Sequence, residues 1–354
     1  MITSIKDFNL HSCNTFRINA QCAEFIEYTS ADDLPAVMQM VGNRPYINIG
    51  GGSNMLFTDD FDGVVLHSRI LDITSDYVDN DKVLLRVGSG VCFDDLIQQC
   101  AQSGLWGIEN LSGIPGEAGA AAVQNVGAYG VEACDVLQKI ECYDARCGRF
   151  VEFAKDECDY GYRHSMFKSP DNHNRYIITH IVISLSGKPI PQIGYKSLRE
   201  AIVDTPVVSP MTVRDAVLAV RAAKLPSVEE YGSAGSFFKN PIVDRAVFDR
   251  ICRQVSEESG AAVSVPHYDL GSQVKIPAAW LIEQCGLKGY VAGDVAVWHL
   301  QPLVIINKTG RATADEILQL EHTIIAKVND RFGITLSPEV EHIGKTTSNI
   351  NTPK

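Results

Sequence analysis

The segment GSAGSFFKNP, residues 232–241, combines a glycine-rich turn with a hydroxyl group, a cation and an amide. Ser236 ends the turn, and Lys239 and Asn240 follow an aromatic pair. A hydrolase nucleophile would need glycine two residues before and after the serine, but alanine and phenylalanine occupy those positions. No histidine lies near Ser236 in the sequence. Adjacent bulky rings favour burial, so the segment is expected to be a packed part of a site.

The sequence NIGGGSN, residues 48–54, can present backbone amide groups to an anion. Residues 44–50 are expected to form a strand, and a strand that enters a glycine-rich turn exposes consecutive N–H groups that can bind phosphate. The pattern is a poor dinucleotide fingerprint, because Met55 occupies the third glycine position and no long helix follows. Taken alone, the turn fits a tight bend as well as it fits a phosphate site.

A second segment, residues 107–130, carries little side-chain bulk because glycine and alanine are frequent in it. A backbone without side chains can lie flat against a large planar ligand and donate N–H groups to its edge. Gln124 and Asn125 add amides, although a buried small-residue turn could have the same composition. Two such segments in one half of the chain favour a nucleotide with a large ring system as the ligand.

Three charged side chains could act in binding or catalysis. Arg163 lies among aromatic residues in YGYRHSMFK, residues 160–168, and a guanidinium can bind a carboxylate through two hydrogen bonds. Lys224 ends an expected helix, where a lysine is also favoured electrostatically. Glu339 follows a proline in SPEVEHIG, residues 337–344. Taken singly, each of these residues also fits an ordinary surface position.

The composition is that of an ordinary globular protein, with 21% of the 354 residues charged and 45% hydrophobic. The formal net charge of −12, without a basic run, argues against nucleic acid as a partner. The sequence shows no signal peptide and no 18-residue apolar stretch, so we expect a cytoplasmic protein without membrane insertion. The ten cysteines lack a C-x-x-C pair and the nine histidines lack a metal-binding spacing, so we expect reduced thiols and no metal site.

Helices and strands alternate irregularly, which indicates an α+β fold rather than a doubly wound sheet. Ser30 is expected to cap a helix, and capping boxes are expected at Thr212–Asp215 and Thr313–Glu316. Two long segments, 107–130 and 186–211, are expected to be loops. The expected helices are 30–41, 93–103, 212–224, 242–255, 276–286 and 313–332. The expected strands are 23–29, 44–50, 63–68, 83–88, 175–185 and 302–307, with a hairpin over 139–153.

These elements suggest three domains: residues 1–70, 71–213 and 214–332. The last expected strand, within residues 333–346, is predicted to return to the middle domain. Leu225-Pro226-Ser227 marks a further plausible boundary, since a proline after a helix ends it.

Taken together, the motifs resemble the UDP-N-acetylenolpyruvoylglucosamine reductase (MurB) family of peptidoglycan precursor synthesis. The inserted segment 186–211, with Tyr195, is similar to the longer subtype, in which that tyrosine closes over the substrate. The segments that carry the resemblance cover nearly the whole chain: NTF (14–16), GGGSN (50–54), ENLSGIPG and QNVGAYG (within 109–130), YGYRHSMFK, GSAGSFFKNP, AAWLIEQCGLKG (278–289) and SPEVEHIG.

The resemblance implies two FAD-binding subdomains of the vanillyl-alcohol-oxidase (PCMH) type, followed by an α+β domain that binds a UDP-sugar. It implies non-covalent FAD as the cofactor and NADPH as the hydride donor. The implied substrate is UDP-N-acetylglucosamine enolpyruvate, which is reduced to UDP-N-acetylmuramate. The protein would thus be a UDP-N-acetylmuramate dehydrogenase, and we expect a monomer.

The resemblance also implies roles for individual residues. Ser236 would protonate the substrate carbon next to the carboxylate, while Arg163 and Glu339 would stabilise the enediolate. The substrate diphosphate and neighbouring groups would be bound by Tyr195, Lys224, Asn240 and Gln301. The positions implied to bind FAD are Gly50, Gly51, Gly52, Ser53, Asn54, Asn110, Ile114, Pro115, Gly116, Gly119, Ala120, Gln124, Asn125, Gly127, Ala128 and Tyr129.

Three segments depart from the family pattern. Glu341 occupies a position where a basic residue is expected, and VWHLQ (297–301) and GEAGAAA (116–122) are unusual. Two other interpretations remain: a different flavin enzyme of the same fold, such as an oxidase of small alcohols or sugars, and an inactive protein that binds a UDP-sugar or nucleotide. The matches at the three proposed catalytic residues favour the reductase over the oxidase. Bound flavin would distinguish either enzyme from the inactive protein.

Overall fold

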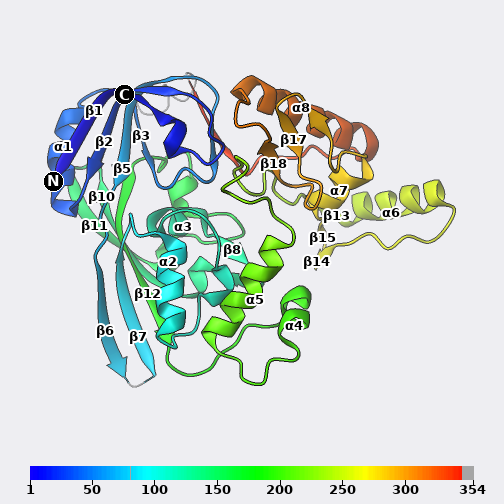
Figure 1. The fold of residues 1–354 in the computed structure, drawn as a ribbon, viewed down its shortest axis with the longest axis horizontal. Coiled ribbons are helices and arrows are strands. Elements are labelled where there is room, and N and C mark those ends of the chain that lie inside the picture. Colours follow the sequence, from blue (N-terminus) through cyan, green and yellow to red (C-terminus); the bar gives the residue numbers. More distant parts are fainter. Residues whose placement is uncertain (80, 345–354) are drawn as a thin grey trace.

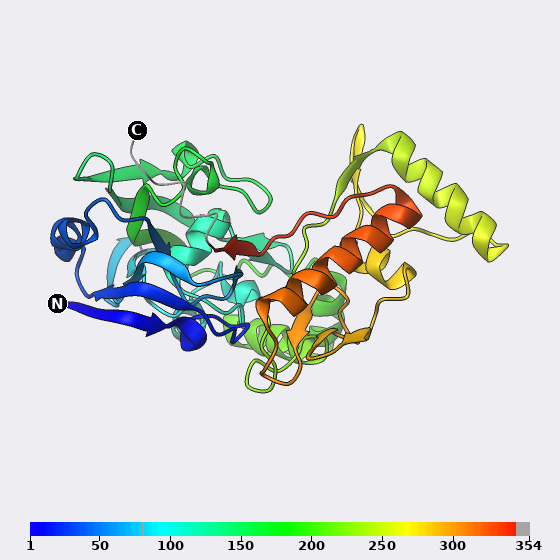
Figure 2. The same ribbon diagram turned by 90° about the horizontal axis from the view of Figure 1, so that it is seen from above.

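The computed structural model describes residues 1–79 and 81–344, and its elements form three groups (Figure 1). The blue N-terminal group lies above the cyan and green middle group, and the yellow and orange third group lies to one side. The turned view shows that the third group projects from the other two, and that the dark red terminal strand reaches back to them (Figure 2).

The first group is built on a four-stranded sheet with the order β1-β2-β5-β3, in which β2 and β3 both run parallel to β5. Helix α1 (Leu34–Val41) packs its buried apolar side chains on this sheet, and Ser30 caps the preceding turn as predicted. The strand β1 was not expected, because most of its side chains are exposed and show no buried face. The strands are β1 (Ile2–Asn9), β2 (Gln21–Tyr28), β3 (Tyr46–Ile49) and β5 (Phe61–Ser68).

The second group is an antiparallel sheet with the order β11-β10-β12-β7-β6. Its long central strand is almost wholly buried, and the helix α2 (Phe93–Gln102) packs in the same core. The predicted hairpin over 139–153 is confirmed, whereas β6 was not expected from the sequence. The strands are β6 (Ile73–Asp79), β7 (Lys82–Gly88), β10 (Leu137–Asp144), β11 (Arg149–Ala154) and β12 (Tyr176–Ser186), with a small pair formed by β8 (Gly127–Ala128) and β9 (Val131–Glu132).

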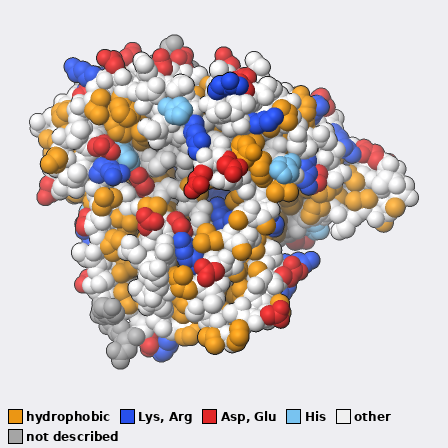
Figure 3. Space-filling model, viewed as in Figure 1, with side chains coloured by type: hydrophobic (Ala, Val, Ile, Leu, Met, Phe, Trp, Pro, Cys, Tyr) orange, Lys and Arg blue, Asp and Glu red, His pale blue; other side chains and the backbone are white. Residues whose placement is uncertain are grey.

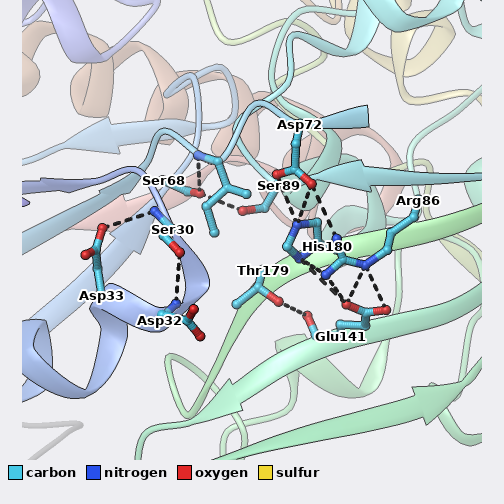
Figure 4. A network of polar contacts seen from close by, with 11 residues as sticks. Ser30, Asp32, Asp33, Ser68, Asp72, Arg86, Ser89, Glu141, Thr179 and His180 are labelled. Atoms are coloured by element: carbon cyan, nitrogen blue, oxygen red, sulfur yellow. Dashed lines mark hydrogen bonds and ion pairs between the residues drawn. The ribbon is translucent and has the colours of Figure 1, made fainter. Parts of the chain in front are cut away.

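A polar network lies across this second sheet (Figure 4). His180 Nε2 on β12 is 3.2 Å from Asp72 Oδ1, and its Nδ1 contacts Arg86, which pairs with Glu141 at 2.7 Å. Burial and the charge of Arg86 lower the pKa of His180, even though two carboxylates lie nearby. The network therefore joins β7, β10 and β12 through paired charges.

The segment 107–130, expected to be a loop, contains the short helix α3 (Ala118–Gln124). Alanine has the highest helix propensity, which explains why this small-residue sequence becomes helical despite its glycine. Asn125, with a φ of 43°, ends the helix in the left-handed conformation. The expected loop 186–211 similarly contains α4 (Lys196–Ile202), because two of its apolar residues pack in a cluster with Trp106.

Helix α5 (Pro210–Ala222) begins one turn earlier than predicted. Ser209 is its cap, and the Ser209 hydroxyl accepts a hydrogen bond from the Thr212 N–H at 3.2 Å. The predicted capping box Thr212–Asp215 is therefore wrong, since Thr212 occupies the third position of the helix. Arg214 on α5 forms a buried ion pair with Asp94 on α2, so the predicted boundary at 213/214 cuts a helix that packs on the second group. We propose that the boundary lies at residues 225–227 instead.

The third group contains two three-stranded sheets packed with three helices around its own core. Its longest helix, α8, begins with the predicted capping box Thr313–Glu316, which is confirmed. The helices are α6 (Arg245–Ser259), α7 (Ala278–Gln284) and α8 (Ala314–Phe332). The strands are β13 (Ile242–Asp244), β14 (Tyr268–Leu270), β15 (Gln273–Lys275), β16 (Val291–Ala292), β17 (Val295–Val297) and β18 (Ile305–Asn307).

The final strand, β19 (Glu341–Ile343), pairs in parallel with β4 (Met55–Phe57). Because β4 follows the first glycine turn, the chain returns to the first group. The prediction that residues 333–346 return to the middle domain is therefore wrong for the described part of that segment, and residues 345–346 lie outside it. Local sequence cannot reveal such a partner, since the pairing joins segments about 285 residues apart, as the Thr58–Ile343 hydrogen bond shows.

Replacement of Arg214 by methionine should lower the free energy of unfolding by about 1–3 kcal/mol, because it leaves the Asp94 carboxylate without its cation. Burial raises the pKa of Asp94, but Arg214 and the Gly113 N–H outweigh it and bring the pKa below its usual value. The pair's contribution is therefore lost as pH falls through that lowered pKa. Denaturant unfolding should give the same free energy of unfolding for wild type and variant in acid. Arg253→Met, on the exposed surface of α6, is the control.

Candidate functional site

A cavity of about 280 Å³ is lined by all three groups of elements. The first group contributes the turn of residues 50–54, the second contributes segments within 114–128, and the third contributes residues 234–236. This volume is near the lower end of small-molecule sites, which begin at roughly 300 Å³. The view of Figure 1 as a space-filling surface shows acidic and basic side chains around a hollow in the middle of the face (Figure 3).

The two glycine turns approach one another at this cavity. A Cβ atom on Gly51 would lie 3.3 Å from the Cα of Gly116, so even one added carbon would crowd the opposite backbone. Gly116 has a φ of 120°, a conformation that suits glycine. The Ser53 hydroxyl donates a hydrogen bond of 3.0 Å to the Pro115 carbonyl and joins the two turns. Bare backbone from both groups thus lines one wall and can accept an anionic or planar ligand.

Gly52 has a different reason to be glycine. A Cβ atom there would collide with the backbone of Cys13 and Asn14, where the motif NTF begins. The Asn14 amide donates to the carbonyls of Leu10 and Ile18 and holds this segment in place. Gly52 and Asn14 therefore shape the turn from behind.

Most of the positions predicted to bind FAD line the cavity, but three do not. Asn110 is buried and donates from its amide to the carbonyls of Tyr129 and Gln192. Asn125 is also buried, and its side chain bonds Glu132, Gly161 and the Cys134 N–H. Asn110, Asn125 and Tyr129 are absent from the lining. The predicted positions that do line it are Gly50, Gly51, Gly52, Ser53, Asn54, Ile114, Pro115, Gly116, Gly119, Ala120, Gln124, Gly127 and Ala128.

The three predicted catalytic residues, Ser236, Arg163 and Glu339, line the same cavity. Arg163 Nε lies 2.7 Å from Glu339 Oε1, but its N–H is not aligned for a hydrogen bond, so the contact is an ion pair. Arg163 also donates from Nη2 to the Gly127 carbonyl at 3.3 Å. Its φ of 54° is left-handed, a conformation that costs a side-chain-bearing residue about 1 kcal/mol or more.

Backbone pairing brings Ser236 and Glu339 to the cavity from distant parts of the sequence. The Phe237 N–H donates to the Leu303 carbonyl, and the Glu339 N–H donates to the Phe237 carbonyl, both at 2.8 Å. Phe237 and Phe238 are fully buried, which confirms the expected packing of this aromatic pair. The serine segment is therefore held between residues 303–304 and residues 337–339.

Burial and the neighbouring charges shift the pKa of Glu339 in opposite directions. Burial raises the pKa of Glu339, while Arg163, Lys168 and Lys239 lower it, and the net result is a raised pKa. Burial also lowers the pKa of Lys168, whose ammonium donates to Gln124 Oε1 at 2.7 Å. The site thus holds a carboxyl group that can be protonated more readily than an exposed glutamate.

Two family models match this chain. Residues 23–154 match the family described as "FAD binding domain", and residues 227–343 match "UDP-N-acetylenolpyruvoylglucosamine reductase, C-terminal domain". The chain is 40% identical over 341 residues to the UDP-N-acetylenolpyruvoylglucosamine reductase of Bacteroides fragilis (strain YCH46), covering 95% of this chain and 99% of the relative. The enzyme of that name from Porphyromonas gingivalis (strain W83) is 39% identical, with 96% and 98% covered.

The chain belongs to the UDP-N-acetylenolpyruvoylglucosamine reductase family. It is therefore an oxidoreductase with a FAD-binding domain of the predicted type and the family's C-terminal domain. A crystal structure of the reductase (MurB) from Thermus caldophilus has the same fold, with a TM-score of 0.65 at 23% identity and coverage of 97% and 98% of the two chains. Within residues 1–79 and 81–344, no helix is both long and apolar enough to span a membrane.

The substrate-binding positions that the family resemblance implies lie outside the cavity lining. Asn240 accepts a hydrogen bond from the Ala278 N–H at 2.9 Å and donates to the Tyr162 hydroxyl at 3.3 Å. The ring of Tyr195 packs edge-on against Tyr129, 5.3 Å away. The other two positions, Lys224 and Gln301, contribute backbone carbonyls to hydrogen bonds in the third group.

Two of the charged residues that line the cavity, Arg221 and Glu117, were given no role in the sequence analysis. Arg221 lies in the last turn of α5, three residues before Lys224, and lines the cavity beside Gly113. Burial lowers the pKa of its guanidinium. Glu117 lines the cavity next to Gly116. Arg221 precedes Lys224 by three residues, about one helical turn, and this spacing could have indicated from the sequence that Arg221 lies near the site.

Glu341, where the family pattern suggests a base, also lines the cavity. His173 Nε2 lies 2.7 Å from Glu341 Oε1, and this hydrogen bond raises the pKa of His173 despite burial. The departure from the family pattern is thus matched by a basic side chain from the second group, which contacts the Glu341 carboxylate.

Replacement of Gly51 by valine should abolish or strongly weaken FAD retention, because its side chain would occupy the space between the two turns. The backbone of Gly51 is not left-handed, so the substitution tests space rather than strain. The ratio of flavin to protein absorbance after gel filtration measures the effect. Gly194→Val, where a Cβ meets no neighbouring atom, is the control. Equal flavin content in both variants would contradict the assignment of this wall.

Proposed function

We propose that this protein reduces UDP-N-acetylglucosamine enolpyruvate to UDP-N-acetylmuramate with NADPH, a step of bacterial peptidoglycan precursor synthesis. The observation that carries the proposal is the convergence of Ser236, Arg163 and Glu339 on the cavity lined by the glycine turns. The names of the relatives describe reductases of this enolpyruvyl sugar, which supports the choice of substrate.

When bound, FAD supplies hydride transfer between the nicotinamide donor and the enolpyruvyl group. The residues present fit this cofactor, since two turns with little side-chain bulk face one cavity. We propose that the turn of residues 50–54 binds the diphosphate through its backbone N–H groups. The small residues of α3 would then accommodate the planar part of the molecule.

Ser236 would donate its hydroxyl proton to the substrate carbon that gains negative charge. A serine hydroxyl is a weak acid, but such a carbon is a strong enough base to take the proton when the two are held in contact. The buried aromatic pair and the backbone bonds to Leu303 and Glu339 fix the position of this serine.

Arg163 and Glu339 would stabilise the charge that develops on the substrate carboxylate. The guanidinium of Arg163 supplies a positive charge, and its Nε lies 2.7 Å from Glu339 Oε1. The raised pKa of Glu339 favours a protonated carboxyl, which can donate a hydrogen bond to an enediolate oxygen. Preorganised donors of this kind stabilise the transition state more than the ground state.

The UDP-sugar would extend from the cavity towards the inserted segment and the third group. We propose that Lys224 contacts the diphosphate and that Tyr195, Asn240 and Gln301 bind neighbouring groups. The Asn240 amide donates a hydrogen bond to the hydroxyl of Tyr162, the residue next to Arg163 in the sequence, and this contact supports the proposed arrangement.

Ser236→Ala should retain flavin reduction by NADPH while slowing reoxidation by the enolpyruvyl sugar about 10²- to 10⁴-fold, because only the second half-reaction needs this proton. Anaerobic stopped-flow absorbance separates the two phases. Ser233→Ala, in the same turn but outside the cavity lining, is the control. Reoxidation of Ser236→Ala at the wild-type rate would remove the serine from the mechanism.

Glu339→Ala should lower kcat by roughly 10²- to 10³-fold, and Glu339→Gln should retain more activity, because its amide still donates a hydrogen bond. In the wild type, kcat should fall as pH rises through the raised pKa of Glu339, since only the protonated form donates. Glu339→Gln should lack this step in its pH–rate profile. Equal kcat values for the two variants, or a pH step of the wild type that Glu339→Gln retains, would argue against a donor role.

A further inference from the structure

Glu117 places a carboxylate at the wall that is proposed to bind the diphosphate. It follows Gly116, lines the cavity, and its Oε2 would be 3.3 Å from a Cβ built on Gly50. Its side chain is only 12% exposed, so solvent screens the charge poorly. An ionised carboxylate in this position would repel an anionic cofactor unless a cation neutralises it.

His67 is in contact with that carboxylate. From β5, its Nε2 lies 2.8 Å from Glu117 Oε1, and its Nδ1 lies 3.0 Å from Glu27 Oε1 on β2. Ionised carboxylates only accept hydrogen bonds, and a neutral imidazole has one N–H to donate. Both contacts can therefore be hydrogen bonds to ionised carboxylates only when the ring is an imidazolium.

The charges packed around His67 balance only in that state. Arg69 Nε lies 3.8 Å from Glu27 Oε1, so the two carboxylates, Arg69 and a protonated His67 sum to zero. A neutral His67 would leave one negative charge beside the glycine turns. Burial, with a smaller contribution from both glutamates, raises the pKa of Cys13, which keeps this neighbouring thiol neutral. Burial by itself lowers the pKa of His67, but the hydrogen bonds and charges of Glu117 and Glu27 outweigh it and raise the pKa.

We propose that His67 is a positioning residue of the FAD site, whose imidazolium neutralises and orients Glu117 so that the glycine turns can accept the cofactor diphosphate. The proposal rests on the placement of the diphosphate at residues 50–54 given above. It also explains the unusual GEAGAAA segment, because a glutamate there requires a cationic partner from the first group.

The direction of the pH dependence follows from this arrangement. FAD affinity should be highest while His67 is protonated and should fall as pH rises through its raised pKa. His67→Gln should weaken FAD binding about 10- to 30-fold at neutral pH, the effect of one unscreened charge several ångströms from the diphosphate. Glu117→Gln should bind FAD at least as tightly as wild type, with little dependence on pH.

The experiment is to measure FAD dissociation from the holoenzyme by fluorescence between about pH 6 and pH 9. The variants are His67→Gln, Glu117→Gln and the double variant, which should regain affinity to within about threefold of wild type because the unpaired charge is gone. The matched control is His180→Gln, which also removes a histidine from between two carboxylates (Figure 4) but lies outside the cavity lining. It should bind FAD like the wild type.

Wild-type affinity in His67→Gln, or a double variant as weak as His67→Gln, would overturn the proposal and leave His67 a merely structural role. If His67→Gln fails to fold, the dependence of FAD affinity on pH decides. The same dependence in wild type and Glu117→Gln would overturn the proposal, and a dependence in the wild type alone would support it. A wild type that binds no FAD at any pH would overturn the proposed function, and this inference with it.

Discussion

The site depends on one extended segment, residues 337–343, which is paired with two distant parts of the chain. On one side the Glu339 N–H donates to the Phe237 carbonyl, which ties the segment to the serine turn of the third group. On the other side the Asn54 amide donates to the Glu339 carbonyl at 3.2 Å, and the Glu341 N–H donates to the Asn54 carbonyl at 3.0 Å. Glu339 is thus held between the first glycine turn and the proposed proton donor. Loss of either pairing would separate residues that are proposed to act on the same substrate.

A second constraint is electrostatic. The chain carries a net charge of −12, yet its proposed cofactor and substrate are both anionic. The structure meets this by local pairing: acidic side chains that line the cavity contact basic ones, with Arg163 beside Glu339 and His173 beside Glu341. His67 beside Glu117 follows the same arrangement. The Glu339 and Glu117 side chains are each only 12% exposed, so water weakens their interactions with these partners little.

Much of the fold could be predicted from local pattern. Features that depend on neighbours within a few residues are confirmed by the structure. They are the capping residues Ser30 and Thr313, the apolar strand over 175–185 and the hairpin over 139–153. The errors fall where packing outweighs local pattern. The segment within 186–211 forms α4 because Trp106 and α5 offer an apolar surface. Helix α3 was missed for a different reason, since its alanines favour a helix locally.

The sequence by itself determined the family, the glycine turns and the identity of the three proposed catalytic residues, because these depend on residue types in a fixed order along the chain. Only the tertiary structure decided that β19 pairs with β4, that Asn110 and Asn125 lie behind the cavity wall, and that Glu117 contacts His67. Each of these outcomes depends on which backbone segments lie side by side. Strand partners and buried ion pairs are chosen by packing across the whole molecule, and a single sequence does not record that choice in any local pattern.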